Sequence, residues 1–563
     1  MSWRRSMTET RASVSALHRR LSSPGLLRRL GVVTFAVFAL AAINLAIGEH
    51  YPFSNFPMFG NPSAGPVDYY FLTDAEGRPL AARATAGVTA PAIKKMIARG
   101  VAEERRKAGT ARPSKSGGDE VQRAAHVVLR KLHRDASRSP MALEPWPSGV
   151  TLRQGLIHSA PQGFRETFRI VAVLPGTTTQ AATSSPRVIR GDAERPHEPS
   201  HPLEVFAWVH LALMAALVAL LAGWTRLPVE TRRWLSVGTD GVGVGRLEAF
   251  CLRLALAFVF WQALQARVYF DTLPHPQGLA TMEWLHPVFV WLGNAEHWHL
   301  VKIAVPALLV WYVCGWGQFL PLTALTLIHV LQRTLFASQG ATHHGHQLLT
   351  LVFCAQTVVA WMLVCCRTTG LRRWWTRPGN HTAVWQAVLV VVASVYVTSA
   401  GYKLIASQGQ WLFHSHHLST QIVKTYRQNH YNDLDPKFLV GDASLPPSKA
   451  DSADARYRHP IPAQAEWIRR YPTPARVFFG FGLFLEAFAF LAAFNRGFAT
   501  LFGIALVMFH LLVLWLMKLD FPLNVATVWV VLVNLPGWIV VWWVRLVRRE
   551  DFVPGPAPAP SGR

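Results

Sequence analysis

The sequence predicts an all-α polytopic membrane protein with about ten transmembrane helices and a small α+β extracytoplasmic insertion. Of its 563 residues, 51% are hydrophobic and only 16% are charged, whereas a soluble domain has about 25% charged residues. Mostly apolar runs recur along the chain, each long enough to cross the roughly 30 Å of hydrocarbon in a bilayer. One long stretch between two such runs mixes strand and helix patterns instead, and this stretch is the predicted insertion.

The predicted spans are separated by segments whose arginine content indicates their side of the membrane. The spans lie at about 31–48, 203–225, 248–269, 299–315, 318–336, 345–366, 382–404, 477–495, 498–517 and 523–546. Residues 1–30 hold seven Arg and one Glu, and arginine recurs in nearly all of the segments expected on the same side, 226–247, 367–381, 496–497 and 547–563, as in cytoplasmic loops. We therefore expect a multi-pass protein of the cell inner membrane, with cytoplasmic tails at 1–30 and 547–563.

Residues 49–202 contain the predicted extracytoplasmic domain and its linker. VDYYFLTDAEGRPL is typical of a β-hairpin with its turn at Asp74–Gly77. Pro91 marks the start of a helix, EVQRAAHVVLRKLHR has helical spacing, and ETFRIVAVL is a strand candidate. The stretch 176–201 is rich in Ser, Thr and Pro, which favours a linker.

The predicted transmembrane bundle occupies 203–546 and includes one long outer loop at 405–476. This loop contains SLPPSKADSADARYRHP, a composition typical of disorder. The cysteines lie in or beside apolar spans without a CxxC pair, so we expect buried thiols and no disulfide framework. They are Cys251, Cys314, Cys354, Cys365 and Cys366.

The net charge of +24 does not by itself indicate a nucleic-acid partner. Much of the excess lies in loops and tails that flank apolar spans, and no helix-turn-helix, zinc or stacking signature accompanies it. Nucleotide chemistry is not indicated either, because the chain has no Walker A loop and no G-x-G-x-x-G after a strand. We expect no nucleic-acid partner.

Basic residues recur at the predicted outer ends of several spans. They are Arg267, Lys302, His329, Arg333, His343, His344, His346, Lys403 and His414. Each alone fits a snorkelling anchor or an interface residue, but together they predict a basic vestibule that would attract an anionic ligand. The histidine clusters also suggest a transition metal, yet no H-E-x-x-H or Cys/His spacing is present, so we expect no metal site.

Glu486 and His510 form a second candidate group. They occupy matching depths in two spans joined by a tight turn at Asn495–Arg496, so the spans should pack antiparallel. A direct pair between the two side chains would lower the cost of burying them. Such a pair fits a structural role better than a proton relay.

Four segments of the predicted bundle carry a resemblance to a known family: THHGHQLLTLVF, AGYKLIASQGQW, FGFGLFLEAFAFLAAFNRGF and FHLLVLWLMKLDF. They resemble the HTTM (horizontally transferred transmembrane) domain family, whose members are similar to the vitamin K-dependent gamma-carboxylase. The resemblance covers about 245–546. It implies that Lys403 is the base linked to oxygenation of a reduced, vitamin K-like quinone. It also implies that His344 assists, with His343 and His346 as alignment alternatives. A lysine desolvated beside other cations can serve as such a base.

Three functions fit these observations. The first is a quinone-linked oxygenation or carboxylation enzyme of the lyase type, with Lys403 and His344 as catalytic residues. The second is a non-enzymatic membrane protein that binds or transports an anionic or lipid ligand through the basic vestibule. The third is a scaffold whose exported domain, at 67–175, recruits a protein partner. Membrane lipid is a partner in all three.

Overall fold

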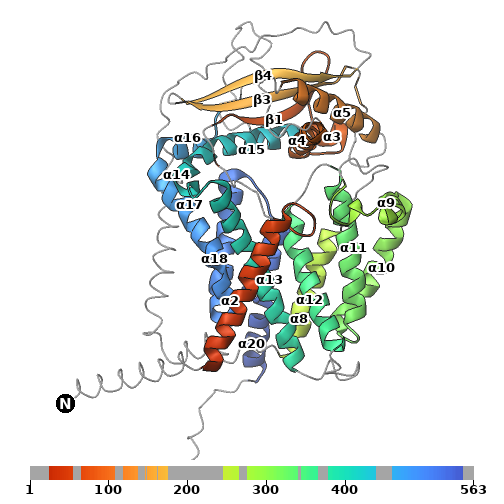
Figure 1. Ribbon diagram of the computed structural model, residues 1–563, viewed down its shortest axis with the longest axis vertical. Helices are drawn as coiled ribbons and strands as arrows, with labels where there is room; N and C mark the ends of the chain where they lie inside the picture. Colours follow the sequence, from red (N-terminus) through yellow and green to blue (C-terminus); the bar gives the residue numbers. More distant parts are fainter. Residues whose placement is uncertain are drawn as a thin grey trace, which may run out of the picture.

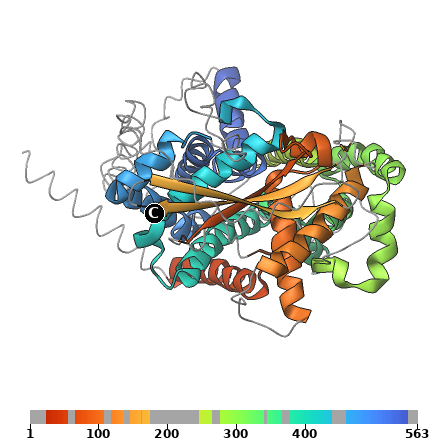
Figure 2. The same ribbon diagram turned by 90° about the horizontal axis from the view of Figure 1, so that it is seen from above.

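The computed structural model describes residues 24–54, 62, 65–107, 118–136, 146–147, 149–160, 163–174, 245–264, 276–339, 344–365, 378–438 and 459–548. Within these ranges the chain is mostly helical and forms a helical bundle with a small sheet domain on one end (Figure 1). Figure 2 shows the strands lying across that end of the bundle. We call this end of the bundle its domain-facing end.

The bundle helices are α2 (Pro24–Ile47), α8 (Arg246–Ala263), α9 (His286–Gly293), α10 (Ala295–Cys314), α11 (Phe319–Ala337), α12 (Gln347–Cys365), α13 (Pro378–Ala406), α17 (Pro472–Ala487), α18 (Arg496–Met517), α19 (Pro522–Val531) and α20 (Leu535–Arg548). Among the described residues, six helical segments are long and apolar enough to cross a membrane. They are Glu296–Cys314, Phe319–Ala337, His344–Cys365, Asn380–Ala406, Pro472–Ala493 and Arg496–Met517.

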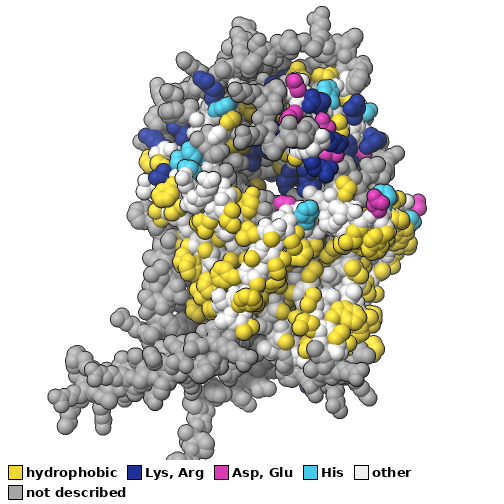
Figure 3. Space-filling model, in the orientation of Figure 1, with side chains coloured by type: hydrophobic (Ala, Val, Ile, Leu, Met, Phe, Trp, Pro, Cys, Tyr) yellow, Lys and Arg dark blue, Asp and Glu magenta, His cyan; other side chains and the backbone are white. Residues whose placement is uncertain are grey.

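The outside of the bundle is apolar as well as its core. Phe35, Phe258 and Ile303 are examples of large side chains that are exposed on helix surfaces. Together such side chains form a broad hydrophobic belt below the sheet domain (Figure 3). Helices that are apolar on all sides are expected where lipid replaces water as the solvent. The prediction of a polytopic helical membrane protein is therefore confirmed.

The number ten stays a prediction. The predicted span 31–48 corresponds to a shorter apolar helix, Gly31–Ile47. The predicted span 248–269 overlaps α8, which carries the charged residues Arg246, Glu248 and Arg253. The predicted span 523–546 is divided between α19 and α20 by a break at Leu532–Asn534. The predicted span 203–225 lies outside the described residues.

The sheet domain combines four described strands with three helices. The strands are β1 (Val67–Thr73), β2 (Pro79–Leu80), β3 (Thr151–Ala160) and β4 (Gly163–Val173), and the helices are α3 (Ala82–Ala86), α4 (Ala90–Lys107) and α5 (Gly118–Ala136). All pairs are antiparallel, in the order β2-β1-β3-β4. The predicted hairpin is confirmed, with Leu72 opposite Leu80 and Gly77 at φ 77° in its turn, a conformation that favours glycine.

Alternate residues of β1 join two different cores. Tyr69 and Phe71 belong to a cluster that includes residues of helix α15 (Leu418–Asp433), whereas Tyr70 and Leu72 pack with α4 and α5. Successive side chains of a strand point to opposite faces of a sheet. The run VDYYFLT is therefore buried on both faces, and one face rests on α15, which connects the domain to the bundle.

The predicted outer loop at 405–476 is largely helical where the structure describes it. It contains α14 (Trp411–His414), α15 and α16 (Ala463–Arg470). The Tyr431 ring of α15 stacks on Phe71 at 4.2 Å between ring centroids. This tertiary packing stabilises a helix whose own sequence is mostly polar. Most of the stretch predicted to be disordered, 444–458, lies outside the described residues.

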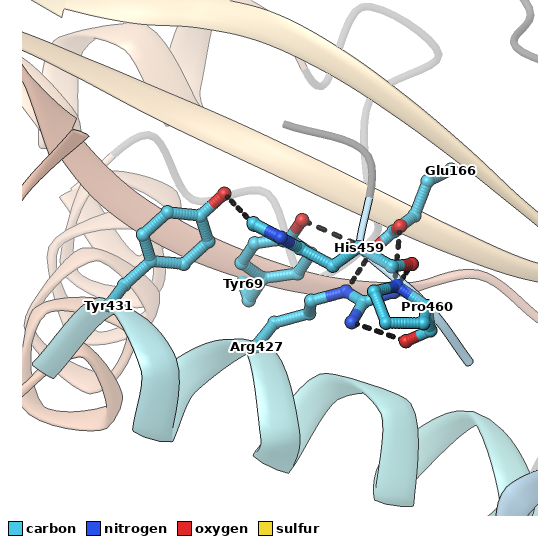
Figure 4. Close-up of polar contacts among 6 residues, drawn as sticks. All are labelled: Tyr69, Glu166, Arg427, Tyr431, His459 and Pro460. Atoms are coloured by element: carbon cyan, nitrogen blue, oxygen red, sulfur yellow. Dashed lines mark hydrogen bonds and ion pairs between the residues drawn. The ribbon is translucent and has the colours of Figure 1, made fainter. Parts of the chain in front are cut away.

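A buried arginine fastens α15 to the sheet. The Arg427 Nε and Nη2 atoms donate to the two carboxylate oxygens of Glu166 on β4, at 2.9 and 3.2 Å (Figure 4). Arg427 also donates to the carbonyls of Pro460 at 3.0 Å and His459 at 2.6 Å, and the Tyr69 hydroxyl donates to Glu166 at 3.1 Å. We call these five residues the Arg427 clasp.

Candidate ligand site at the domain-facing end of the bundle

Helix α11 turns His329 and Arg333 into the bundle. They lie one helical turn apart, as predicted, and their exposed fractions are 0% and 3%. The His329 ring lies 5.1 Å from the Phe260 ring of α8 and 6.0 Å from the His346 ring before α12, between centroids. The predicted residues His329, Arg333 and His346 are thus brought together where three helices meet.

Buried polar atoms at this place have no hydrogen-bond partner. In the described part of the chain this holds for both ring nitrogens of His329 and for Arg333 Nε. Arg333 Nη2 donates to the carbonyl of Ala263, at the end of α8. Buried polar groups are normally hydrogen-bonded, and leaving one unbonded costs about 1–3 kcal/mol. The arrangement therefore suits a ligand that supplies acceptors.

The segment after α2 covers this group of residues. Tyr51 is buried, and its hydroxyl bonds to Thr350 of α12; its ring hydroxyl also interacts electrostatically with Arg333. The Tyr51 carbonyl passes so close to Gly278 that a Cβ there would lie 2.1 Å from its oxygen. Sequence analysis missed Tyr51, because nothing in its local pattern connects it to helices more than two hundred residues away.

His344 lies above this layer, toward the sheet domain. Its Nδ1 is 2.9 Å from Gln347 Oε1 and its Nε2 is 3.7 Å from Glu49 Oε2. It also interacts electrostatically with two cations of α4, Lys95 and Arg99. We call His329, Arg333, His344, His346 and Tyr51 the His329–Arg333 site.

Lys403 belongs to a different buried group. It forms an ion pair with Glu486 of α17, and the side chains are only 8% and 7% exposed. Ser399 donates to the same carboxylate at 3.2 Å, and Lys403 Nζ lies 5.4 Å from the Trp411 ring centroid. These contacts show an ammonium that is buried but compensated by charge.

The expected direct pair between Glu486 and His510 is not the arrangement that the structure has. Glu486 pairs with Lys403, and His510 Nε2 bonds to the Tyr396 hydroxyl at 3.0 Å. Lys403 is close enough to His510 for an electrostatic interaction, so the three residues do share one depth. Their depth was readable from the sequence, but the rotation of α13, which turns Lys403 and Tyr396 between them, was not. We call Tyr396, Ser399, Lys403, Glu486 and His510 the Lys403 group.

Two other predicted vestibule residues lie on other elements. Lys302 is half-buried on α10 and makes no hydrogen bond or ion pair within the described ranges. His414, on α14, has its ring 6.0 Å from that of His417. Arg267 and His343 lie outside the described residues. Among the described residues, no cluster of three or more His, Cys, Asp or Glu side chains could hold a metal ion.

Comparison of the chain with protein-family models, with curated proteins and with solved structures finds no match.

Proposed function

We propose that the protein crosses the membrane about ten times, with both termini in the cytoplasm and the sheet domain outside. We further propose that it binds an anionic ligand in the His329–Arg333 site. One observation carries this proposal: His329 is fully buried beside Arg333, and neither of its ring nitrogens has a hydrogen-bond partner among the described residues. A bound anion would accept hydrogen bonds from both side chains and offset the charge of Arg333.

The surroundings favour a small anion or the polar head of an amphiphile. Within the described residues Arg333 forms no ion pair with a carboxylate, so its charge is available to a ligand. The aromatic rings of Phe260 and Tyr51 border the site and suit an apolar or ring-shaped body. Bicarbonate and a reduced, acidic quinone both meet these requirements.

Binding can be tested on purified full-length protein in lipid nanodiscs by titration calorimetry. Bicarbonate and a water-soluble reduced quinone serve as probes, and His329→Phe and Arg333→Gln are the site variants. Lys302→Gln is the matched control, because it removes a positive charge from a half-buried position on α10. We expect at least about tenfold weaker binding in the site variants and no change in the control.

Two outcomes would count against the proposal. The first is that folded wild-type protein binds neither probe. The second is that His329→Phe and Arg333→Gln bind the probes as tightly as wild type does.

Quinone-linked oxygenation or carboxylation is the second candidate function, with Lys403 as base. The expected partner His344 lies in the His329–Arg333 site, and the histidine beside Lys403 is His510. The Lys403 group supports it, because it places a lysine, a carboxylate, a histidine and a tyrosine together in a buried environment. A base must be neutral, so the proton of Lys403 would first have to move to Glu486. The resemblance of 245–546 to the HTTM family, which rests on the quoted sequence segments alone, implies the same lysine as base.

The enzyme proposal is tested by following quinone epoxide formation with oxygen and labelled bicarbonate. Lys403→Arg retains the charge opposite Glu486 but removes a group that can become neutral. Epoxide from wild type and none from Lys403→Arg would support catalysis by Lys403. Absence of epoxide from folded wild-type protein would leave ligand binding as the function.

A further inference from the structure

A second basic group lies where the sheet domain rests on the bundle. Lys94, Lys95 and Arg99 come from α4, and Lys424 comes from α15. Lys424 interacts electrostatically with Lys94 and Lys95, and Lys95 interacts with Arg99. We call these four residues the junction cluster. None of them was singled out by the sequence, because α4 and α15 are more than three hundred residues apart.

The cluster is held by contacts on both sides of the junction. Arg99 Nη1 donates to the carbonyl of Ala337, at the end of α11, at 3.1 Å. Lys94 Nζ pairs with Asp68 Oδ1 of β1 at 2.6 Å, and Lys424 Nζ donates to Gln421 Oε1 at 2.6 Å. These three cations are therefore held by contacts to α11, β1 and α15 and are not freely moving surface charges.

Positive charge exceeds negative charge at the junction. Among the described residues, the acidic groups that interact with the cluster are Asp68 and Glu49. Within the part of the chain that the structure describes, these four cations and two carboxylates sum to a net charge of about +2 when all are ionised. An excess of this size in a partly buried place is costly unless an anion offsets it.

The nearby positive charges and the burial lower the pKa values of two lysines in the cluster. Burial, with the positive charges of Lys94 and Lys95, lowers the pKa of Lys424 to about 7, although Asp68 opposes the shift. Burial also lowers the pKa of Lys95 to about 8, with Arg99 acting in the same direction and Glu49 against it. An anion that binds here would hold both lysines in their charged form.

The cluster also lies next to the end of a candidate membrane span, where a lipid headgroup is expected. Figure 3 shows Lys and Arg side chains gathered in a hollow between the sheet domain and the apolar belt. Lys95 and Arg99 interact with His344, the first residue of a candidate membrane span. A phosphate could reach this place from water or as the headgroup of a lipid in the adjoining leaflet.

We propose that the junction cluster binds a phosphate dianion between the sheet domain and the bundle. The charge of the ligand matches the excess of the cluster, whereas a monocarboxylate would offset only part of it. An arginine fork and several lysine point charges are the donors that proteins use for phosphate oxygens. This cluster shares no residue with the His329–Arg333 site, although Lys95 and Arg99 interact electrostatically with His344 of that site, and the proposal does not depend on the proposed function.

The test uses purified full-length protein and three probes. Inorganic phosphate and sulfate are titrated by calorimetry into protein in detergent. Binding to lipid vesicles, with and without phosphatidic acid, is measured by flotation of protein that has not been placed in nanodiscs. The variants are Lys95→Gln and Lys424→Gln. Lys131→Gln is the matched control, because Lys131 is a largely buried lysine paired with Asp135 on α5, outside the cluster. We expect each site variant to weaken binding about tenfold or more, and the control to leave it unchanged.

The conservative variants Lys95→Arg and Lys424→Arg separate charge from folding. Both should keep phosphate binding, because arginine retains the charge. Sulfate stays a dianion across the tested range, so it reports on the protein alone. Its affinity for wild type should fall between about pH 6 and about pH 9, as Lys424 and Lys95 lose their protons. The double arginine variant should show little of this fall.

The outcomes separate the two sources of phosphate and the two sites. Binding of inorganic phosphate supports a soluble ligand, and binding only to vesicles with phosphatidic acid supports a lipid headgroup. Absence of binding to all three probes overturns the proposal, as does equal binding by wild type and the glutamine variants. His329→Phe, which tests the proposed function, should leave phosphate binding unchanged, so failure at one site is distinguishable from failure at the other.

Discussion

Two buried arginines in this protein have opposite environments. Arg427 in the clasp donates to both oxygens of Glu166 and to two carbonyls. Arg333 donates to the carbonyl of Ala263, and its Nε has no partner within the described residues. The two arginines have the same residue type and are both buried, so neither property separates a structural arginine from one that is proposed to bind a ligand. The number and charge of the partners does.

The Lys403 group lies between these extremes. Its ammonium has one carboxylate partner, Glu486, and an aromatic ring nearby. The pair neutralises the charge, which makes the group tolerable inside the bundle without a ligand. The three buried cations, Arg427, Lys403 and Arg333, can thus be ordered by how fully their partners compensate the charge. Mutations can test this order.

The largest loss of stability is expected from Arg427→Met. This change leaves the Glu166 carboxylate buried without its cation, which costs about 3–5 kcal/mol. Chemical unfolding of the purified protein measures the loss, and limited proteolysis reports whether the sheet domain comes away from α15. The double variant Arg427→Met/Glu166→Gln should recover part of the stability. A loss below about 1 kcal/mol in the single variant would show that the clasp does not hold the domain.

A somewhat smaller loss, about 3 kcal/mol, is expected from Lys403→Met. Glu486 then loses its ion pair, but it can take up a proton and still accept from Ser399. A double-mutant cycle with Glu486→Gln measures the coupling between the two side chains. If the two single losses simply add, the ion pair contributes nothing.

The sequence predicted those parts of the structure that depend on local pattern. The hairpin turn at Asp74–Gly77, the helix after Pro91 and the strand over ETFRIVAVL all rest on turn residues or periodicity within one segment. The four-residue spacing of His329 and Arg333 likewise placed both on one face of α11. Whether these two residues lie close to His346 depends on packing between spans, which the sequence pattern did not predict.

The unpredicted parts depend on packing between distant segments. β3 was missed because TLRQGLIHSA has no strict alternation of apolar and polar residues. α15 was assigned to a loop because its helical form depends on contact with β1. For the Lys403 group, span depth predicted that Glu486 and His510 lie level, but the rotation of each helix decided that Lys403 would be the partner of Glu486.

A gain of stability is expected from His329→Phe in protein without ligand. The change removes two ring nitrogens that have no partner in the described part of the chain and places a ring beside Phe260. We expect about 1–2 kcal/mol of stabilisation, measured by chemical unfolding. His510→Phe is the matched control, because it removes a half-buried histidine that hydrogen-bonds to Tyr396 and should therefore destabilise the protein. A loss in both variants would remove the evidence for a ligand at His329.

A gradual loss of folding stability is expected as the pH is lowered, because two histidines in or beside the clasp are buried. Burial, together with the charges of Arg427 and His430, lowers the pKa of His459 to about 2, and burial lowers the pKa of His430. The folded state therefore keeps these rings neutral while the unfolded chain binds protons below about pH 6.5. Stability should be fully present above that pH and fall as the pH decreases below it. His459→Gln should flatten this fall, and an identical pH profile in that variant would contradict the assignment.

The smallest effect is expected from an exposed ion pair that, like the clasp, joins the sheet domain to α15. Arg83 of α3 pairs with Asp433 of α15 at 2.9 Å, and the side chains are 44% and 48% exposed. Solvent screens such a pair, so Asp433→Asn should cost no more than about 0.5 kcal/mol in the unfolding measurement used for Arg427→Met. Both contacts hold the sheet domain to α15, so the two variants compare a buried ion pair with a solvent-exposed one at the same interface. If Asp433→Asn lost nearly as much stability as Arg427→Met does, the number of partners and their burial would not determine how much each cation contributes to stability. The argument that separates Arg427 from Arg333 would then fail.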